Sequence, residues 1–393
     1  MSTTAPAHIL IVGGGGTGGA LAHDLTLRGL KVTLVDRGEV TSGTTGRHHG
    51  LLHSGARYAV GDKESAVECI EENMILRRIC PGSFEENDGL FVAIDDEDME
   101  YLEPFLKGCA ESGIPTQQLT PSEALALEPN LNPELKAAVR IPDGTMDAMR
   151  MPLRFFATAK HNGAKIHPYA EVKDLIVHDR VVSGALVHDH VTGKDGQLRA
   201  DIVVNATGPW SERIASMAGV DVPIRPSPGV LLALRGRLCN MVINRLHKSG
   251  DGDIVVPQRG LSVVGTSSWT VENPDDLGVP EDHVQRMYDE GAKLIPAVKR
   301  VEFRAAWSAA RPLIGSRGDE DTGRELSRTF KTFDHKDSDG VEGFVTITGG
   351  KGTTLRGMAE LCANVICGKL GVEAECRTRE TVLLPHTAYY SAA

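Results

Sequence analysis

The chain has 393 residues, of which 41% are hydrophobic and 24% are charged, and this ordinary composition excludes disordered, collagen-like and coiled-coil proteins. A chain of this length predicts two domains or one large interleaved α/β body. The formal net charge of -11 at pH 7 argues against a nucleic-acid surface, because phosphate backbones require clustered Lys and Arg, but a few arginines inside a pocket still allow a small anionic substrate.

The first predicted element is a strand that runs directly into a glycine-rich turn. Apolar residues 8–12 precede the turn at 13–18, a helix is expected over 17–28, and a second apolar run at 31–35 ends at Asp36. A strand, a glycine-rich turn, a helix and an acidic residue in this order predict a dinucleotide-binding βαβ unit. The alternative is a strand-helix turn that binds no ligand.

Three glycines and one carboxylate would form that dinucleotide site. Gly13 permits the tight turn, Gly15 lets the backbone approach a pyrophosphate, and Gly18 lets the helix pack closely on the strand. Asp36 would hold a ribose hydroxyl.

The middle of the chain begins with a loop at 41–57 that is rich in Gly, Ser, Thr, His and Arg, as is typical of loops that lie over a ligand. The elements expected after it are a helix at 64–79, a strand at 89–94, a helix at 98–113, a hairpin at 172–186 and a buried strand at 200–205. Short apolar runs at 229–234, 254–256 and 261–265, separated by turn residues, then predict an antiparallel sheet.

A second glycine-rich junction between a strand and a helix lies near the carboxyl end. A strand at 344–347 meets the turn at 348–354, and a helix is expected from there to about residue 370. The apolar face of this helix, expected to pack on a sheet, consists of Leu355, Met358, Cys362, Val365 and Ile366. Backbone N–H groups and the helix dipole favour another electron-rich part of a ligand here, so one long cofactor could touch both junctions.

The seven cysteines are odd in number, scattered and never spaced as C-x-x-C, which predicts no disulfide framework, zinc site or iron-sulfur cluster. The adjacent side chains of His48 and His49 are expected to diverge, so neither a metal site nor covalent flavin attachment is predicted. An amino terminus without a basic-then-apolar signal, and no apolar run of about 18 residues, predict a cytoplasmic protein, with peripheral attachment at the inner face of the cell membrane left open.

Taken together, the motifs resemble the FAD-dependent, amino-acid oxidase-like superfamily, and most closely its glycerol-3-phosphate dehydrogenase branch, especially the large catalytic subunit of the anaerobic bacterial enzyme. The resemblance covers nearly the whole chain. It rests on GGGGTGGALAHDLTLRG at 13–29, TSGTTGRHHGLLHSGARYAV at 41–60, IPDGTMD at 141–147, VVNATGPW at 203–210, ARPLIG at 310–315 and ITGGKGTTLRGMAE at 347–360.

This resemblance implies an α/β protein with a Rossmann-like FAD-binding domain and an interleaved α+β substrate domain that contains an antiparallel sheet. The FAD-binding domain is expected at 1–80, 145–220 and 336–393, and the substrate domain at 81–144 and 221–335. The isoalloxazine ring is expected between the two domains.

The resemblance also implies which residues bind FAD, from the adenosine end to the flavin ring. They are Gly13, Gly15, Gly18, Asp36, Arg37, Thr44, Gly46, Arg47, Leu51, Leu52, Val172, Ala206, Gly208, Gly350, Lys351, Gly352, Thr353 and Thr354.

Five residues are expected to act on the substrate. Arg311 resembles the family arginine that clamps a carboxylate or phosphate with two prongs, and Arg328 matches a second arginine of the glycerol-3-phosphate branch; for both, the alternative is an ion pair. His53 is the candidate proton acceptor, because an imidazole of ordinary pKa near ~6.5 can accept a proton at neutral pH, and the alternative is that it only orients the loop. Tyr58 matches an active-site tyrosine of the family, and Lys351 could stabilise reduced flavin or bind substrate. For both residues the alternative is a packing role or a structural ion pair.

The implied reaction is oxidation of sn-glycerol 3-phosphate or a similar phosphorylated polyol by hydride transfer to flavin N5. A dehydrogenase or oxidase of a small 2-hydroxy acid or amine is the alternative within enzymes, because one scaffold serves many substrates, and a docking subunit or silent binding protein is the third interpretation. Departures from the branch at Pro228, Leu231, Gly352 and Leu355 affect the substrate assignment and leave the flavin assignment intact. The electron acceptor is expected outside the chain, as a quinone, a partner subunit or oxygen.

Overall fold

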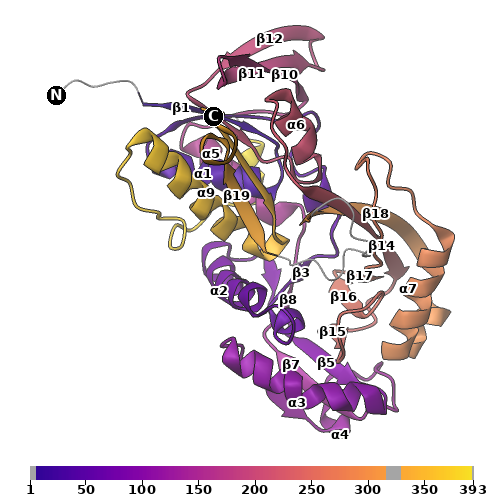
Figure 1. Ribbon diagram of the computed structural model, residues 1–393. Coiled ribbons are helices and arrows are strands. Elements are labelled where there is room, and N and C mark those ends of the chain that lie inside the picture. The colour runs from indigo at the N-terminus through magenta and orange to yellow at the C-terminus, as the bar shows by residue number, and fades with distance from the viewer. Residues whose placement is uncertain (1–5, 316–328, 392–393) are drawn as a thin grey trace.

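The structure is a computed structural model that describes residues 6–315 and 329–391, and its two main sheets occupy the upper and lower halves of Figure 1. The first sheet has six strands in the order β19-β20-β13-β1-β2-β9. The strands are β1 (His8–Val12), β2 (Lys31–Val35), β9 (Lys165–His167), β13 (Ile202–Asn205), β19 (Phe330–Asp334) and β20 (Phe344–Gly349). All neighbours are parallel except β19 and β20, so the predicted Rossmann-like domain is confirmed.

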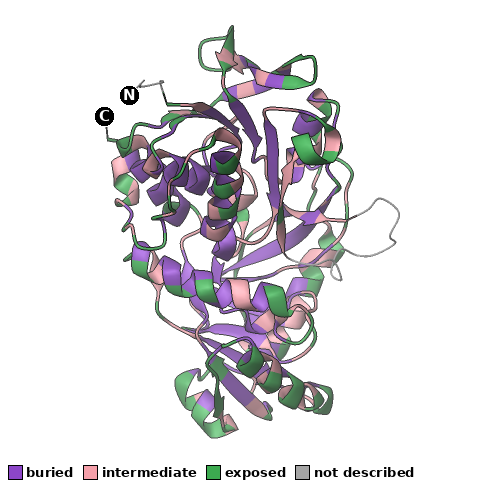
Figure 2. Cartoon of the chain, turned by 60° about the vertical axis from the view of Figure 1, so that its left-hand side comes forward, coloured by how far each residue is buried: buried purple, intermediate pink, exposed green. Residues whose placement is uncertain are grey.

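Strand β1 shows how one strand supplies the core on both faces of this sheet, because successive side chains of a strand point to opposite sides. Ile9 and Ile11 pack with three helices, whereas Leu10 and Val12 pack with β10, β11 and the helix α6 (Ser211–Met217) on the other face. The three helices are α1 (Gly16–Leu27), α5 (Arg150–His161) and α9 (Leu355–Leu370). The four central strands β20, β13, β1 and β2 are mostly buried between these layers (Figure 2), whereas the edge strands β9 and β19 are partly or fully exposed.

A small antiparallel sheet of three strands lies at the top of Figure 1. Its strands are β10 (Ala170–His178), β11 (Val181–Asp189) and β12 (Lys194–Arg199). The hairpin predicted at 172–186 is therefore confirmed, and β12 extends it by a third strand.

The second large sheet has eight strands in the order β18-β14-β17-β16-β15-β5-β7-β6. The strands are β5 (Gly89–Ala93), β6 (Gln117–Leu119), β7 (Ala137–Ile141), β14 (Ile224–Arg235), β15 (Val242–Arg245), β16 (Ile254–Gln258), β17 (Leu261–Gly265) and β18 (Phe303–Ile314). Neighbouring strands are antiparallel, as predicted, except β15 and β5, which are parallel. Because β5 and β15 are far apart in the chain, no local sequence pattern could have predicted that they pair in parallel.

Helices cover both faces of the second sheet. Leu90 and Val92 pack toward α7 (Glu281–Leu294) and α4 (Pro121–Leu127), whereas Phe91 packs on the other face against α3. The helix predicted at 98–113 is α3 (Asp96–Glu111), which begins two residues earlier because the Asp95 carboxylate caps it by accepting from the Asp98 N–H at 2.9 Å.

The longest ladder of the fold joins β14 and β18, from the pair Ile224 and Ile314 to the pair Leu234 and Phe303. Prolines are unusual inside a strand because they lack an N–H donor. Pro226 and Pro228 are accommodated because β17 pairs with β14 only from Leu231 onward, and backbone N–H groups of the following loop, at Val271 and Trp269, donate to the two proline carbonyls.

The remaining elements lie between and around the two large sheets. They are the small sheet of β3 (Leu51–Leu52), β8 (Gly144–Met146) and β4 (Phe84–Glu85), the helices α2 (Lys63–Ile79) and α8 (His335–Asp339), and the 3-10 turns η1 (Thr44–Arg47), η2 (Ala56–Tyr58), η3 (Gly208–Trp210), η4 (Pro296–Arg300), η5 (Gly352–Thr354) and η6 (His386–Tyr389).

The division into two interleaved domains stays a proposal, and one of its boundaries needs a change. The expected boundary at 335/336 assigns β19 to the substrate domain, but β19 hydrogen-bonds to β20 at the edge of the first sheet. We therefore place β19 in the FAD-binding domain.

Three further features of the chain are the state of its cysteines, the length of its helices and the grouping of its potential metal ligands. Six of the seven cysteines are buried, and all seven are free thiols. Within residues 6–315 and 329–391, no helix has the length and apolarity needed to cross a membrane, and no group of His, Cys, Asp or Glu is placed to hold a metal ion.

Candidate active site

A cavity of about 1820 Å³ lies at the carboxyl ends of β1, β2, β13 and β20 and is closed on its other side by β14, β16 and β18. The carboxyl edge of an open parallel sheet is where ligands bind in such folds, because the strand order reverses there. Its volume exceeds the roughly 300–1,000 Å³ of pockets for drug-sized ligands. The cavity therefore has room for a dinucleotide together with a small substrate.

The first glycine-rich turn forms one end of the cavity. Gly13 has a φ of +112°, and a Cβ there would lie 2.6 Å from the Ala206 carbonyl oxygen. A Cβ on Gly18 would lie 2.0 Å from the Gly13 carbonyl oxygen, so only glycine lets α1 pack this closely on the turn. Gly15 precedes α1 and lines the cavity at the helix amino terminus.

Asp36 closes the turn as well as lining the cavity. Its Oδ2 accepts a hydrogen bond from the Gly14 N–H at 2.6 Å, and its Oδ1 accepts from the Gly38 N–H at 2.8 Å. Burial raises the pKa of this carboxyl, and the two N–H groups oppose that effect.

Most of the residues expected to bind FAD line this cavity. They are Gly13, Gly15, Asp36, Arg37, Thr44, Arg47, Leu51, Val172, Ala206, Gly208, Gly350, Lys351 and Gly352. The others are Gly18, Gly46, Leu52, Thr353 and Thr354, which are not part of the lining. Gly46 shows why such a residue still matters, because a Cβ there would lie 2.5 Å from the Thr41 carbonyl oxygen.

The second glycine-rich junction lies next to the first in the cavity wall, where Leu355 approaches Gly16 and Met358 accepts from Thr17. Gly350 has a φ of +72°, and the following turn is fixed by the Lys351 N–H, which donates to Thr354 Oγ1 at 3.1 Å. A buried arginine, Arg356, then ties α9 to α2, because its Nε donates to Glu72 at 2.8 Å and its Nη1 donates to Glu360 at 2.6 Å. The contact between α2 and α9 sets the junction against the loop that carries His53.

The backbone of His53 is held from both sides. Its N–H donates to Thr353 Oγ1 at 3.1 Å, and its carbonyl oxygen accepts from Asn73 Nδ2 at 3.0 Å. The next N–H, of Ser54, donates to the buried carboxylate of Asp143 at 2.6 Å. The position of the loop therefore depends on main-chain contacts at His53 rather than on its ring.

Burial lowers the pKa of His53 well below its usual value, and the neighbouring charges of His49, Arg57 and Lys351 lower it further. The ring is therefore uncharged at neutral pH, and the ordinary pKa expected from the sequence was wrong. Its centroid lies 5.5 Å from that of Tyr58 and 6.3 Å from that of His49.

Two further histidines in the cavity wall were given no role by the sequence. Burial lowers the pKa of His48 to about 4 and that of His49 to about 3. The Nδ1 atom of each accepts a backbone N–H, from Gly50 at 2.9 Å and from Leu51 at 3.1 Å. The two ring centroids lie 6.4 Å apart with an interplanar angle of 83°, so the rings meet edge to face in the wall of the same cavity.

Lys351 and Tyr58 meet beside His53. The Lys351 ammonium lies 5.0 Å from the centroid of the Tyr58 ring and 3.8 Å from Glu68 Oε2. Its side chain is 7% exposed, so this cation contributes to the field inside the cavity rather than at the surface.

Arg311 lies on β18 in the cavity wall and is held by backbone carbonyls. Its Nε donates to Ser227 O at 3.1 Å, and its Nη2 donates to Pro228 O at 3.0 Å and to Ser267 O at 2.8 Å. Gly229 makes room for this arrangement, because a Cβ there would lie 2.7 Å from Arg311 Nη2. The other expected arginine, Arg328, lies outside the described residues.

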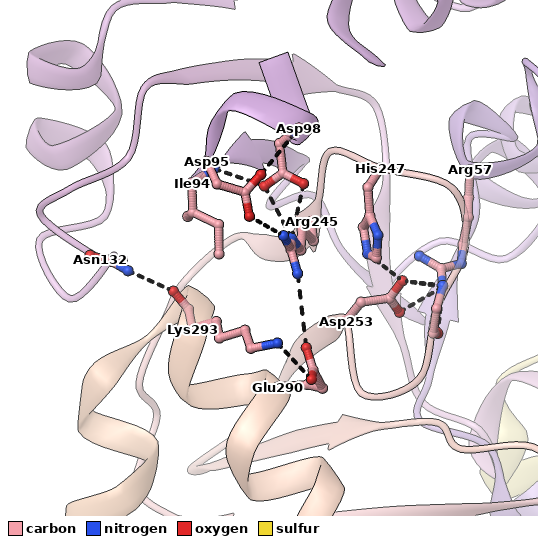
Figure 3. A network of polar contacts seen from close by, with 11 residues as sticks. Arg57, Ile94, Asp95, Asp98, Asn132, Arg245, His247, Asp253, Glu290 and Lys293 are labelled. Carbon is pink, nitrogen blue, oxygen red and sulfur yellow. Dashed lines mark hydrogen bonds and ion pairs between the residues drawn. The ribbon is translucent and has the colours of Figure 1, made fainter. Parts of the chain in front are cut away.

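Arg57 is a cavity residue that sequence reasoning did not assign. It directly precedes Tyr58, and its Nη2 contacts both carboxylate oxygens of Asp253, at 2.6 and 2.7 Å (Figure 3). The position of Arg57 beside Tyr58 in the loop motif was the signal that could have identified it as a cavity residue. Asp253 could not be paired with it from sequence, because 196 residues separate the two.

A loop that follows β17 of the second sheet reaches the rim of the cavity beside Arg37. Asp275 accepts from Arg37 at 2.6 Å, from Arg213 at 2.7 Å and from Trp210 Nε1 at 2.8 Å. The Arg37 guanidinium also lies 4.7 Å from the centroid of the Trp210 ring. The side chain of Arg37 therefore bridges the two halves of the molecule at the cavity rim.

Comparison with known proteins adds to this geometry. A model of the FAD dependent oxidoreductase family matches residues 8–364. The chain is 42% identical over 377 residues to one subunit of the anaerobic glycerol-3-phosphate dehydrogenase of Haemophilus influenzae, covering 95% of this chain and 67% of that protein. It is 43% identical over 388 residues to one subunit of the Haloferax volcanii enzyme of the same name, covering 95% of this chain and 66% of that protein. The chain thus spans about two thirds of the length of these relatives.

Solved structures share the fold. The glycerol-3-phosphate dehydrogenase of Bacillus halodurans, complexed with FAD, is 22% identical with a TM-score of 0.73, covering 97% of this chain and 68% of that one. The glycine oxidase of Geobacillus kaustophilus is 22% identical with a TM-score of 0.74, covering 97% and 99%. One architecture thus occurs in enzymes named for a phosphorylated polyol and for an amino acid, and the substrate must be argued from the cavity.

Proposed function

Because the chain belongs to the family of FAD dependent oxidoreductases, we propose that it binds FAD in the large cavity and oxidises sn-glycerol 3-phosphate or a similar phosphorylated polyol. The proposed substrate rests on one observation: the cations Arg57, Arg311 and Lys351 lie in the same cavity wall as the neutral imidazole of His53. An alcohol that also carries a phosphate needs both features. The relatives that are 42% and 43% identical are named glycerol-3-phosphate dehydrogenases.

The two glycine-rich junctions fit FAD. Gly13 and Gly350 have left-handed or related backbone angles, and side chains there would collide with Ala206 and Met358. Each junction leads into a helix amino terminus at the cavity, α1 after Gly13 and the η5–α9 turn after Gly350, and such termini favour anionic ligand groups. We assign the pyrophosphate and adenosine to the Gly13 end and the flavin to the Gly350 end. When bound, FAD supplies the acceptor for the hydride.

His53 is the proton acceptor in this proposal. Its neutral ring can take the hydroxyl proton from the substrate as the carbon loses its hydride. Thr353 and Asn73 hold the main chain of His53 and thereby the position of the ring.

The cations hold the anionic group of the substrate. Arg311 is kept in place by three carbonyls, which fix its guanidinium plane before a ligand arrives. Arg57 and Lys351 flank Tyr58 and His53, so an anion held there keeps the hydroxyl carbon close to the imidazole. Arg328 stays a proposed second phosphate contact.

The electrons leave through an acceptor outside the chain. Each of the dehydrogenase relatives at 42% and 43% identity is one subunit of its enzyme, which supports transfer to a partner subunit; a quinone at the inner face of the cell membrane is the other acceptor of this proposal. Fast turnover with artificial dyes or quinone analogues and slow peroxide formation are expected. Peroxide formation as fast as dye reduction would make the protein an oxidase.

Anaerobic reduction of the bound flavin by a substrate panel tests the function. The purified holoprotein is mixed with sn-glycerol 3-phosphate, glycerol, a small 2-hydroxy acid or a small amine, and flavin bleaching is recorded. We expect rapid bleaching by sn-glycerol 3-phosphate alone, with glycerol as the matched control that lacks the phosphate. Bleaching by the hydroxy acid or amine instead would replace the proposed substrate, and no bleaching by any member would favour a binding or docking role. FMN or no flavin in the denatured supernatant would refute the cofactor assignment.

A further inference from the structure

We propose that Asp253 is a positioning residue that orients Arg57 so that Arg57 Nη1 serves an anionic oxygen of the substrate. The inference rests on the proposed function, because it takes the substrate to be an anion held by Arg57. It adds a residue of the second sheet, far from the glycine-rich junctions, to the determinants of substrate affinity.

The pair joins two parts of the molecule at the cavity wall. Arg57 belongs to η2, in the loop that also carries His53, whereas Asp253 ends the loop between β15 and β16. The side chain of Arg57 is 10% exposed and that of Asp253 is 1% exposed. A charged pair this well buried has a fixed geometry, because water cannot replace either partner.

The Asp253 carboxylate is built to hold one guanidinium nitrogen. Both of its oxygens accept from Arg57 Nη2, and Oδ2 also accepts from the Gly250 N–H at 2.7 Å and lies 3.2 Å from His247 Nε2. Arg57 Nη2 in turn reaches the Gly250 carbonyl at 3.3 Å. Arg57 and its neighbours hold the pKa of Asp253 far below its usual value, so the group is a carboxylate at any pH of interest.

The donors of Arg57 are not all used within the protein. Nη1 is buried and has no hydrogen-bond acceptor among the residues that the structure describes. Leaving such a donor without an acceptor costs about 1–3 kcal/mol, and more for a charged group. Because Arg57 lines the cavity, an oxygen of a bound anion can accept the hydrogen bond that Nη1 does not make within the protein.

A second arginine in Figure 3 shows what a purely structural arginine looks like in this sheet. Arg245 donates through Nε to Asp98 at 3.0 Å and through Nη2 to Asp95 at 2.5 Å, and its Nη1 lies 4.0 Å from Glu290. Every nitrogen of Arg245 faces a carboxylate, and Arg245 does not line the cavity. Arg57 has the same kind of buried carboxylate partner and differs in keeping one nitrogen for a ligand.

The direction in which Asp253→Asn changes the affinity for an anion distinguishes a positioning role of Asp253 from a purely electrostatic one. Asp253→Asn removes a negative charge near the substrate anion, and by Coulomb attraction alone this change would tighten anion binding. A weaker affinity in this variant therefore comes from displaced cavity groups and not from the lost charge, and the Arg57→Lys background separates Arg57 from the 247–250 loop that Asp253 also holds. This opposition makes the substitution a stringent test.

The experiment compares wild-type holoprotein with Asp253→Asn and with the matched control Asp98→Asn, which breaks the other buried pair of Figure 3. Inorganic phosphate is titrated while the flavin spectrum is recorded, and KM and kcat are measured with sn-glycerol 3-phosphate. We expect Asp253→Asn to raise the phosphate Kd and the KM about tenfold or more, with kcat and FAD content little changed. Asp98→Asn is expected to lower Tm and leave both constants within about twofold.

Two further variants keep the inference falsifiable. In an Arg57→Lys background the effect of Asp253→Asn on KM should largely vanish, because coupled residues are not additive. If Asp253→Asn does not fold, Asp253→Glu keeps the charge but shifts it by one methylene, and a raised KM is again expected. A KM and phosphate Kd equal to or lower than wild type in the folded variant would overturn the inference. The phosphate titration stands even if sn-glycerol 3-phosphate fails to bleach the wild-type flavin, so the two failures can be told apart.

Discussion

Replacing His53 by glutamine should abolish most of the reductive half-reaction without unfolding the site. The main-chain contacts to Thr353 and Asn73 do not involve the ring, so the variant keeps them and loses only the proton acceptor. General-base catalysis contributes about 10²–10⁴-fold, which corresponds to roughly 3–5 kcal/mol of barrier. We expect flavin reduction to slow by that factor while FAD content stays that of the wild type.

The pH dependence of wild-type activity gives an independent check on His53. Burial and the nearby cations place its pKa well below the usual value, and a base acts only in its unprotonated form. Lowering the pH from 8 to 6.5 should therefore leave kcat/KM of the reductive step unchanged, with a decline only at pH well below 6.5. Anaerobic rapid mixing across this range measures it. A reduction rate of His53→Gln within about threefold of wild type would refute the assignment, as would an acid limb near an ordinary histidine pKa that His53→Gln removes; a limb that persists in the variant belongs to the substrate phosphate.

Three further substitutions test other parts of the site. Arg311→Lys keeps the charge but loses the fixed guanidinium plane, so kcat/KM should fall about ten- to hundred-fold with FAD content retained, and unchanged kinetics would make Arg311 structural. Gly13→Ala should strip FAD during gel filtration, because the new Cβ would lie 2.6 Å from Ala206 O at a φ of +112°, and full flavin content would contradict this. Glu72→Gln removes a buried partner of Arg356 and should cost about 3 kcal/mol of unfolding free energy in urea, whereas a loss under about 1 kcal/mol would show that Glu360 suffices.

The parts of the site that could be predicted are those whose chemistry is local in sequence. Gly13, Gly18 and Asp36 lie within one strand-turn-helix-strand unit, in which Gly18 packs on Gly13 and Asp36 accepts from the Gly14 N–H, although the close contact of Gly13 itself is with the distant Ala206. The second junction at Gly350 and Thr354 follows the same logic. Hydrogen bonds between near neighbours leave a pattern that one sequence is enough to show.

The parts that could not be predicted join segments far apart in the chain. Arg57 meets Asp253 and Arg37 meets Asp275 only because the second sheet folds back over the first, and no spacing records either pair. Predicting β14 at 229–234 missed its first five residues, because Pro226 and Pro228 read as turn residues until the loop that satisfies their carbonyls is known. Tertiary partners decide such positions.

The contact of the paired strands β14 and β18 with the first half of the molecule has a consequence for how the enzyme exchanges its ligands. These two strands run together over twelve residues each, and Thr44 and Arg47 of the first half are hydrogen-bonded to Ala310 and Trp307 on β18. Swinging one half of the molecule away from the other would break these two hydrogen bonds, whereas the ladder itself, which lies within the second sheet, would stay intact. Separation of the two halves is therefore opposed at Thr44 and Arg47, and if substrate enters without it, turnover should be insensitive to solvent viscosity unless diffusion itself is limiting.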